Sequence, residues 1–277
     1  MTERTWFITG INSGFGRQLS EQILAGGGRV AGTVRRAGSV DDLKGQYGDA
    51  LWVGYADVTD AAQIRSVVDA AFAALGPIDA VVANAGYGLF GAAEEFTDTQ
   101  VEQQISTNLL GSIWTVRAAL PHLRAQAGGR IIQFSSVAGL IANAGGSIYH
   151  ASKWGVEGFA EALAEEVAPF GIEVTIVAPG GARTSFAHGS LQLAEPMTAY
   201  DGTPASFLRV LKDGNIPIIG DPAKMAATVI ATLDQDPAPL RLVLGSDSYA
   251  GIVSQLQERL AQILPQQDSA ARTDADD

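Results

Sequence analysis

The segment TGINSGFG, residues 9–16, places three glycines directly behind a short apolar run, TWFIT at residues 5–9. A helical pattern of apolar residues follows, from Phe15 to Ala25. Glycines at a turn from a strand to a helix permit positive φ angles and let backbone N–H groups approach a phosphate at the helix N-terminus. The segment therefore predicts a strand-turn-helix unit that binds a nucleotide. The spacing is GxxxGxG rather than GxGxxG, and tight packing of the helix on the strand is the alternative interpretation.

The rest of the chain repeats this alternation. Further β-branched runs, bounded by Gly, Asp or Asn, predict strands at 29–34, 50–55, 79–84, 130–135, 172–178 and 240–245. The segments between them carry apolar residues at helical spacing. Strands that alternate with helices form right-handed crossovers and a mainly parallel sheet that is covered on both faces. The pattern predicts a doubly wound α/β fold with its ligand at the carboxyl ends of the strands.

The 277 residues suit one domain, which we place at residues 1–265. The segment 180–221 is long for a connection inside a compact domain, and such loops usually bind a ligand, so we predict a substrate-binding loop there. Residues 266–277 lack apolar periodicity and carry four aspartates, which predicts a disordered, solvated tail.

The formal charge of −12 argues against nucleic acid and against anionic membranes as partners, because only 18 Lys and Arg are spread over the chain. The first ten residues, MTERTWFITG, lack the apolar core of a signal peptide, and no apolar run is long enough for a transmembrane helix. We therefore expect a cytoplasmic protein. The chain has no cysteine, and its three histidines show no metal spacing, so no metal site is predicted.

The end of the second predicted strand bears on the choice of nucleotide. An acidic residue there accepts a hydrogen bond from the ribose 2′-OH of NAD, whereas an arginine suits the 2′-phosphate of NADP. The chain reads Val34-Arg35-Arg36 at this point, with no carboxylate. We therefore predict NADP(H) as the preferred cofactor. NAD(H) remains the alternative, since Asp41 or Asp42 could reach a ribose.

The segment YHASK, residues 149–153, sets a tyrosine and a lysine one helical turn apart, on a helix predicted to run from Tyr149 to Val167. Lowering a tyrosine pKa from about 10 to about 7 requires roughly 4 kcal/mol. One ammonium at about 4 Å supplies about this much at an effective dielectric constant of 20. We therefore predict that Lys153 lowers the pKa of Tyr149 and that Tyr149 acts as a general acid and base. Burial would oppose this shift because it disfavours the phenolate, and the positive nicotinamide ring of an oxidised cofactor would be a second contributor to it.

Six motifs in this order and spacing resemble the short-chain dehydrogenase/reductase family: TGINSGFG (9–16), NAG (84–86), Asn108 in TNLLG, SSVAG (135–139), YHASK (149–153) and PGGART (179–184). The resemblance extends from residue 5 to about 245. It implies a single Rossmann-type domain, a three-layer sandwich with a seven-stranded parallel sheet. It also implies NAD(P)-dependent conversion between alcohols and carbonyl compounds, in a homodimer or homotetramer.

The resemblance assigns roles to individual residues. Tyr149 exchanges the proton, Ser136 polarises the substrate oxygen, Lys153 holds the nicotinamide ribose, and the backbone of Asn108 supports a proton-relay water. Ser135 competes with Ser136, and Ser136 matches the family's serine. The implied cofactor contacts are Gly10, Asn12, Ser13, Gly14, Phe15, Gly16, Arg35, Asp57, Val58, Asn84, Ala85, Gly86, Tyr149, Lys153, Pro179, Gly180 and Thr184. For Asp57 and Asn84, turn capping is an alternative of equal weight.

Three segments are expected to line the substrate pocket: 86–96, 140–147 and 185–200. They are rich in Leu, Phe, Ile, Ala and Gly, which favours a neutral, fairly apolar ketone or alcohol. NAGYGLFGAAEE and PGGARTSF resemble hydroxysteroid- and retinol-dehydrogenase-like members. Glu94 and Glu95 are interpreted as solvated.

Two other functions are alternatives to this one. A dinucleotide-binding sensor that has lost its chemistry is the first, although residues 108, 136, 149 and 153 are intact. A sugar-nucleotide epimerase is the second, and it is disfavoured by chain length and glycine spacing. The helices at 98–123 and 149–169 carry apolar residues on more than one face, which fits burial against a second copy of the chain, although a large monomer core would give the same pattern: Ile113, Trp114, Val116 and Phe159.

Overall fold

A computed structural model describes residues 4–184, 191–206 and 218–275. Its middle layer is a seven-stranded sheet in the order β3-β2-β1-β4-β6-β7-β9, and every neighbouring pair is parallel. The strands are β1 (Thr5–Thr9), β2 (Arg29–Val34), β3 (Leu51–Tyr55), β4 (Ala80–Ala83), β6 (Gly129–Phe134), β7 (Ile172–Pro179) and β9 (Arg241–Leu244). All seven predicted strands are present, so the Rossmann-type fold class is confirmed.

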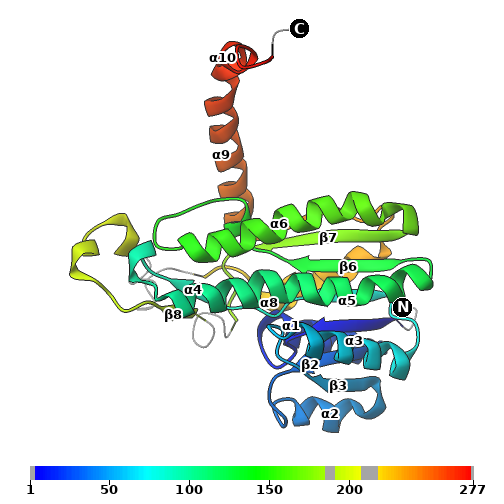
Figure 1. Ribbon diagram of the computed structural model, residues 1–277. Coiled ribbons are helices and arrows are strands. Elements are labelled where there is room, and N and C mark those ends of the chain that lie inside the picture. Colours follow the sequence, from blue (N-terminus) through cyan, green and yellow to red (C-terminus); the bar gives the residue numbers. More distant parts are fainter. Residues whose placement is uncertain (1–3, 185–190, 207–217, 276–277) are drawn as a thin grey trace.

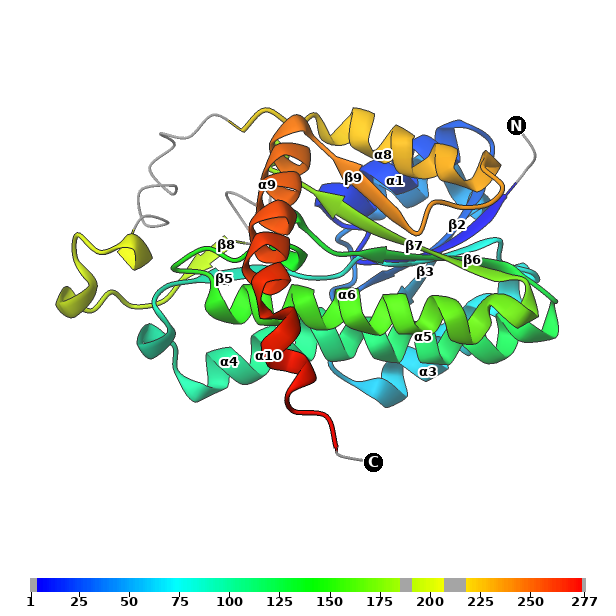
Figure 2. The same ribbon diagram turned by 90° about the horizontal axis from the view of Figure 1, so that it is seen from above.

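Helices cover both faces of this sheet (Figure 2). One face carries α3 (Ala61–Leu75), α4 (Asp98–Ile105), α5 (Gly111–Ala125) and α6 (Ser147–Val167). The other face carries α1 (Gly14–Ala25) and α8 (Pro222–Ala231), with α2 (Asp41–Tyr47) at its edge. α3 and α8 begin at aspartates, Asp60 and Asp221, whose carboxylates accept backbone N–H groups of the first turn.

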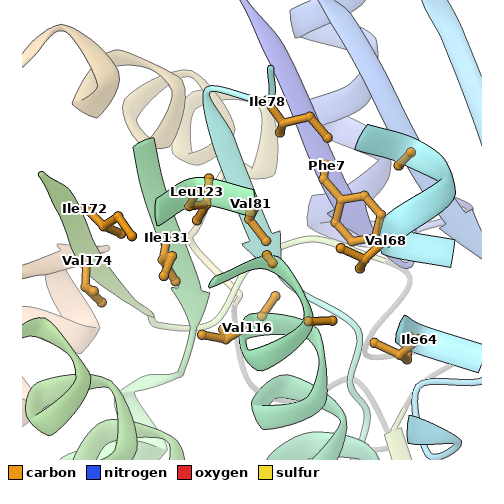
Figure 3. Close-up of a cluster of buried hydrophobic side chains, with 14 of the residues drawn as sticks. Phe7, Ile64, Val68, Ile78, Val81, Val116, Leu123, Ile131, Ile172 and Val174 are labelled. Carbon is orange, nitrogen blue, oxygen red and sulfur yellow. The ribbon is translucent and has the colours of Figure 1, made fainter. Parts of the chain in front are cut away.

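Each face has its own hydrophobic core. The first core joins Phe7, Val81 and Ile131 of the sheet to Val68 of α3 and Val116 of α5, and Figure 3 shows these side chains converging between the layers. The second core includes Ile8, Leu19 and Val229 beneath α1 and α8. Val116 is fully buried in the first core, so it does not belong to an intersubunit surface as the sequence suggested.

The order of the strands reverses direction between β1 and β4. The chain moves from β1 outward through β2 and β3 and then crosses back to β4 on the other side of β1. The carboxyl ends of β1 and β4 therefore meet beside a crevice, which is the usual ligand position in such sheets. This places the glycine turn, residues 10–13, next to Asn84.

Shorter elements complete the chain. A second, two-stranded parallel sheet pairs β5 (Gly88–Phe90) with β8 (Leu191–Leu193). A π-helical turn, η3 (Ser106–Leu110), separates α4 from α5, where the sequence predicts one continuous helix. The 3-10 turns are η1 (Gly48–Ala50), η2 (Ala93–Glu95), η4 (Val137–Gly139), η5 (Ala168–Phe170), η7 (Thr198–Tyr200), η8 (Pro204–Ser206), η9 (Thr232–Asp234) and η10 (Leu264–Gln266).

The C-terminal segment is helical. α9 (Ser246–Ile263) extends away from the sheet, and α10 (Gln267–Ala271) follows it (Figure 1). The sequence predicts a disordered tail from residue 266, and the structure differs there because residues 267–271 form α10. These residues are exposed, as expected for a solvated segment.

Candidate active site

The glycine turn is shaped by close backbone contacts. Gly10 and Gly14 have φ angles of 76° and 56°, a region that favours glycine. A Cβ atom on Gly16 would lie 2.2 Å from the carbonyl oxygen of Gly10, so only glycine fits at the start of α1. Among the described residues, the Ser13 side chain does not cap the first turn. Since no side-chain cap is made there, the N–H groups of this turn remain available to an anion, as is common at a helix N-terminus.

Asn84 locks the glycine turn to the neighbouring strand. Its side-chain Nδ2 donates to the carbonyl oxygens of Thr9, at 2.8 Å, and Gly10, at 3.4 Å. The hydroxyl of Thr9 in turn accepts from the backbone N–H groups of Asn84 and Ala85, at 3.0 and 3.1 Å. The Asn84 side chain is thus committed to holding β1 and β4 together, and the backbone at 84–86 lines the crevice.

The edge of the crevice beside β2 is positively charged. Arg35 directly follows β2 and is exposed. The carboxylate of Asp42 is engaged by the guanidinium of Arg17, which also binds Glu21 at 2.6 Å. This hydrogen bond to Arg17 is the main reason that the pKa of Asp42 lies below its usual value. Asp42 is therefore held toward α1, although the sequence left it open as a ribose ligand.

Asp57 follows β3 and shapes a turn. Its Oδ1 accepts from the N–H and the hydroxyl of Thr59, at 2.9 and 2.7 Å, and its own N–H donates to Gln63 at 3.0 Å. Val58 is buried against Gly111 at the start of α5. The Asp57 carboxylate is thus used in turn capping.

Tyr149 and Ser136 form a hydrogen-bonded pair behind the crevice. Tyr149 lies in the first turn of α6 and is only 8% exposed. Burial raises the pKa of its phenol, and the hydrogen bond with Ser136 lowers it. Ser136 rather than Ser135 thus lies at Tyr149, whereas the Ser135 hydroxyl is buried without a hydrogen-bond partner among the described residues.

Lys153 follows one turn later and is 7% exposed. Its ammonium donates to the carbonyl oxygen of Phe134 at 3.0 Å, at the end of β6. Burial lowers the pKa of Lys153 to about 8, and the negative charge of Glu157 raises it. The pKa of Tyr149 is raised, and burial is the largest influence on it, whereas the sequence predicts that Lys153 lowers it.

Asn108 lies within the π-helical turn and is 1% exposed. Its amide brackets Tyr87: Oδ1 accepts from the Tyr87 N–H at 3.0 Å, and Nδ2 donates to the Tyr87 carbonyl at 2.9 Å. Nδ2 also reaches the hydroxyl of Ser152 at 3.2 Å, and that hydroxyl donates to the carbonyl of Tyr149 at 2.7 Å. Asn108 thus ties the turn after β4 to the helix that carries Tyr149 and Lys153.

The stretch after β7 reaches the same crevice. Asp247 at the start of α9 accepts from the N–H of Gly181 at 2.8 Å. A Cβ atom on Gly180 would lie 2.3 Å from the same carboxylate, so Gly180 cannot carry a side chain without moving it. Thr184 is the last described residue before the gap at 185–190, and part of the expected substrate wall therefore lies outside the described residues.

The wall opposite Tyr149 is built from β5 and β8. The rings of Phe90 and Tyr149 lie 5.1 Å apart. Glu95 is 7% exposed rather than solvated, because its two carboxylate oxygens accept from the N–H groups of Ala92 and Met197, both at 2.8 Å. Glu95 thus joins the segment 86–96 to the long loop, a link that a pattern of adjacent glutamates does not reveal.

His150 is buried beside this wall. Its Nδ1 lies 2.9 Å from the carbonyl of Ala138, and its Nε2 accepts from the N–H of Asn143 at 3.1 Å. These contacts fix Ala138 and Asn143, and Asn143 belongs to the segment 140–147 that is expected to line the substrate pocket. Across residues 4–184, 191–206 and 218–275, no group of His, Asp and Glu side chains is arranged to hold a metal ion.

Comparison with known proteins now identifies the family. Residues 4–193 match the family model for short chain dehydrogenases. Oxidoreductase BOA17 of Botryotinia fuckeliana is 36% identical over 251 residues, which cover 90% of this chain and 92% of that protein. A short-chain dehydrogenase from Streptomyces avermitilis has a TM-score of 0.91 at 36% identity, with 99% of each chain covered. The chain belongs to the short-chain dehydrogenase family and is an oxidoreductase, as the sequence motifs indicated.

Further comparisons concern ligands. The 3-ketodihydrosphingosine reductase of Bacteroides thetaiotaomicron is 35% identical over 74% of this chain and 73% of its own. Two structures with bound cofactors are 22–23% identical to this chain, a level that shows the fold alone. ElxO was solved with NADP (TM-score 0.75, 90% of this chain and all of ElxO covered). A Burkholderia phymatum protein was solved with NAD (TM-score 0.78, 95% of each chain covered).

Proposed function

We propose that the protein is an NADP(H)-dependent oxidoreductase that interconverts a secondary alcohol and a ketone, or a primary alcohol and an aldehyde. The substrate is a neutral, fairly apolar small molecule, and Tyr149 is the general acid and base. The observation that carries this proposal is the buried Tyr149–Ser136 pair, with Lys153 one turn away. It lies at the carboxyl ends of the strands, beside a glycine turn that is open to a phosphate.

The crevice fits a nicotinamide dinucleotide. Gly10, Gly14 and Gly16 keep side chains out of the turn where a pyrophosphate would bind, and the N-terminus of α1 faces it. Lys153 would hold the nicotinamide ribose, and Pro179, Gly180 and Thr184 would contact the carboxamide end. Bound NADPH supplies a hydride to the carbonyl carbon of the substrate.

Side chains of the protein transfer the proton. Because burial raises its pKa, Tyr149 is protonated near neutral pH and can donate to the substrate oxygen during reduction. Ser136 donates a hydrogen bond to the same oxygen and stabilises the charge that develops there. In oxidation the phenol accepts the proton in return. Lys153 carries positive charge beside this pair, and the π-helical turn at Asn108 presents a backbone that can support a water.

The cofactor preference rests on the rim beside β2. Arg35 is exposed there, and Asp42 is engaged by Arg17. Charge-assisted hydrogen bonds contribute about 1.5–3 kcal/mol each, so Arg35 favours a 2′-phosphate by a factor of ten or more.

The preference is tested by Arg35→Asp. We expect the ratio of kcat/KM for NADPH over NADH to fall at least tenfold. Lys44→Asp is the matched control, since it makes the same charge change at an exposed position of α2 and should leave the ratio within twofold. An unchanged ratio in Arg35→Asp would refute the NADP assignment.

The substrate class rests on the lining of the site. The described part of the wall includes Phe90, beside Tyr149, and Leu89 and Ala194 in a small apolar cluster with Phe96. One relative is named for the reduction of a ketone, 3-ketodihydrosphingosine, which supports a carbonyl substrate.

The proposal is tested by following NADPH oxidation with a panel of ketones and aldehydes of increasing chain length. Turnover is expected for apolar members and not for phosphorylated or carboxylated ones. A dinucleotide-binding sensor, the alternative function, would bind NADPH and consume none with any member of the panel.

Two further proposals concern the oligomeric state and the cellular location of the protein. We infer a homodimer or homotetramer, as the resemblance implies, and a cytoplasmic location. No helix in the described part of the chain is both long and apolar enough to cross a membrane.

A further inference from the structure

The C-terminal helix α9 leaves the body of the protein with a row of exposed apolar side chains. Figure 1 shows the helix rising from the edge of the sheet near β7 and ending far from the core. Tyr249, Leu256, Leu260 and Ile263 are 65%, 49%, 56% and 64% exposed, and Leu264 of the following turn is 64% exposed. From Leu260 through residue 275, every residue is exposed.

These side chains follow a coiled-coil spacing. Tyr249, Val253, Leu256, Leu260 and Ile263 are separated by four, three, four and three residues. A repeat of 3.5 residues keeps apolar side chains on one stripe along a helix, which is the pattern of a helix that packs lengthwise against another helix. We call these five residues the α9 seam.

The seam is separate from the face by which α9 is attached. Ile252 and Ser248 are buried against the body, and the Ser248 hydroxyl donates to the carbonyl of Ala178 at 2.9 Å. Arg259 stacks on Trp154 of α6, with its guanidinium carbon 4.1 Å from the ring centre. The body thus covers one side of α9 and leaves the α9 seam exposed, apart from the half-buried Val253.

Beyond Arg259, the described residues of α9 and α10 are all exposed and lack such support. A helical segment of this length is marginal in water unless an apolar face is packed. The described residues of this chain do not cover the seam, so a partner is needed to bury it.

We propose that the partner is a second copy of this chain, whose own α9 packs antiparallel on the seam. A pair centred at residue 258 sets Leu256 against Leu260 of the second copy and Val253 against Ile263. Four apolar layers then form about a two-fold axis. Such a self-complementary surface is what a symmetric dimer requires.

Charge favours this partner over a lipid surface. The chain carries a formal charge of −12, yet the α9 seam and the flanking Ala250, Gln257 and Leu264 hold no carboxylate. Two copies can therefore approach along this stripe without like-charge repulsion. Helices that lie on membranes are rich in Lys and Arg. α9 has no lysine, and its one arginine, Arg259, is turned onto Trp154.

The contact is small, because the four layers bury only Val253, Leu256, Leu260 and Ile263 of each copy, and small interfaces of this kind are weak and transient. We therefore expect a dimer that dissociates on dilution.

The inference is tested on the full chain by sedimentation velocity over a range of concentrations. The wild type should contain a species of twice the 28.8 kDa chain mass, or a larger even-numbered assembly. Leu256→Glu with Leu260→Glu should halve the mass of that assembly. The matched control, Ser254→Glu with Ala261→Glu, adds the same charge at exposed positions across the helix and should leave the mass unchanged.

A second measurement does not disturb the seam. The chain has no cysteine, so a single introduced thiol reports one position. Gln257→Cys lies beside the proposed axis and should be joined into a covalent dimer by a short bismaleimide, whereas Ser254→Cys on the far side of the helix should not.

Three results would overturn the inference: a monomeric wild type, an assembly unaffected by the seam variant, or equal cross-linking at 254 and 257. If the wild type is monomeric and floats with neutral phosphatidylcholine vesicles, the seam binds lipid instead. None of these readouts uses NADPH turnover, so failure here leaves the proposed oxidoreductase function standing, and the reverse also holds.

Discussion

The two sides of the crevice present different chemical groups to a ligand. On the side of β1, β2 and β4, the surface offered to a nucleotide is mostly backbone, shaped by glycines and locked by the Asn84 amide. On the side of β6 and α6, it consists of buried side chains: Ser136, Tyr149 and Lys153. Substitutions on the first side should therefore change binding, and substitutions on the second should change the chemical step.

The largest contrast is expected between the two adjacent serines of the chemistry side. Ser136→Ala should lower kcat by about 10²–10³, because it removes a donor to the substrate oxygen. Ser135→Ala should change kcat less than threefold, since its buried hydroxyl has no described partner. NADPH turnover at saturating substrate measures both, and equal losses would contradict the assignment of Ser136.

The cofactor side is tested by a pair of helix glycines. Gly16→Ala forces a Cβ atom into the carbonyl of Gly10, and we expect it to weaken NADPH binding at least tenfold and to destabilise the fold by about 1–3 kcal/mol. Gly45→Ala in α2 meets no atom within 4 Å and should leave affinity unchanged. Titration of NADPH fluorescence and thermal unfolding give the two readouts.

The smallest expected effect is on the pH dependence of turnover, and it concerns Glu157, one turn beyond Lys153. Glu157 is 5% exposed, and its Oε2 accepts from Arg241 at 2.7 Å, while Arg241 also binds the exposed Glu161. The negative charge of Glu157 raises the pKa of Lys153, which burial lowers to about 8. If protonated Lys153 is needed for turnover, activity is lost as the pH rises through this pKa.

Removing the carboxylate should move this loss to lower pH. For Glu157→Gln we expect the alkaline limb of kcat/KM to shift down by on the order of 0.5–1 pH unit, because Arg241 offsets part of the charge. Glu161→Gln shares Arg241 and should leave the limb in place. A shift in both variants, or in neither, would leave Glu157 with only a structural role.

Much of the fold follows from local patterns in the sequence. The seven strands lie within one residue of their predicted ranges, since each is a β-branched run bounded by turn residues. The helix predicted from Phe15 to Ala25 is likewise found, as α1 at Gly14–Ala25. The i,i+4 spacing brought Tyr149 and Lys153 onto one helix.

Other features depend on tertiary contacts. Apolar residues continue at helical spacing before and after the π-helical turn at Ser106–Leu110, so the sequence predicts one continuous helix there. Glu95 is polar, so the sequence predicts a solvated side chain, and its burial depends in part on the backbone N–H of Met197, which is distant in the sequence. The sequence predicts opposing influences of Lys153 and of burial on the pKa of Tyr149, and burial, whose extent depends on the packing around α6, is the largest influence.

The claim that a buried side chain supplies the proton is tested most directly by Tyr149→Phe. This substitution removes the phenolic hydroxyl and keeps the ring beside Phe90. Carbonyl reduction should fall by about 10²–10⁴ in kcat, the usual contribution of a general acid, while NADPH affinity stays within about threefold of the wild type. Turnover within tenfold of the wild type would show that another group supplies the proton and would contradict the assignment of Tyr149.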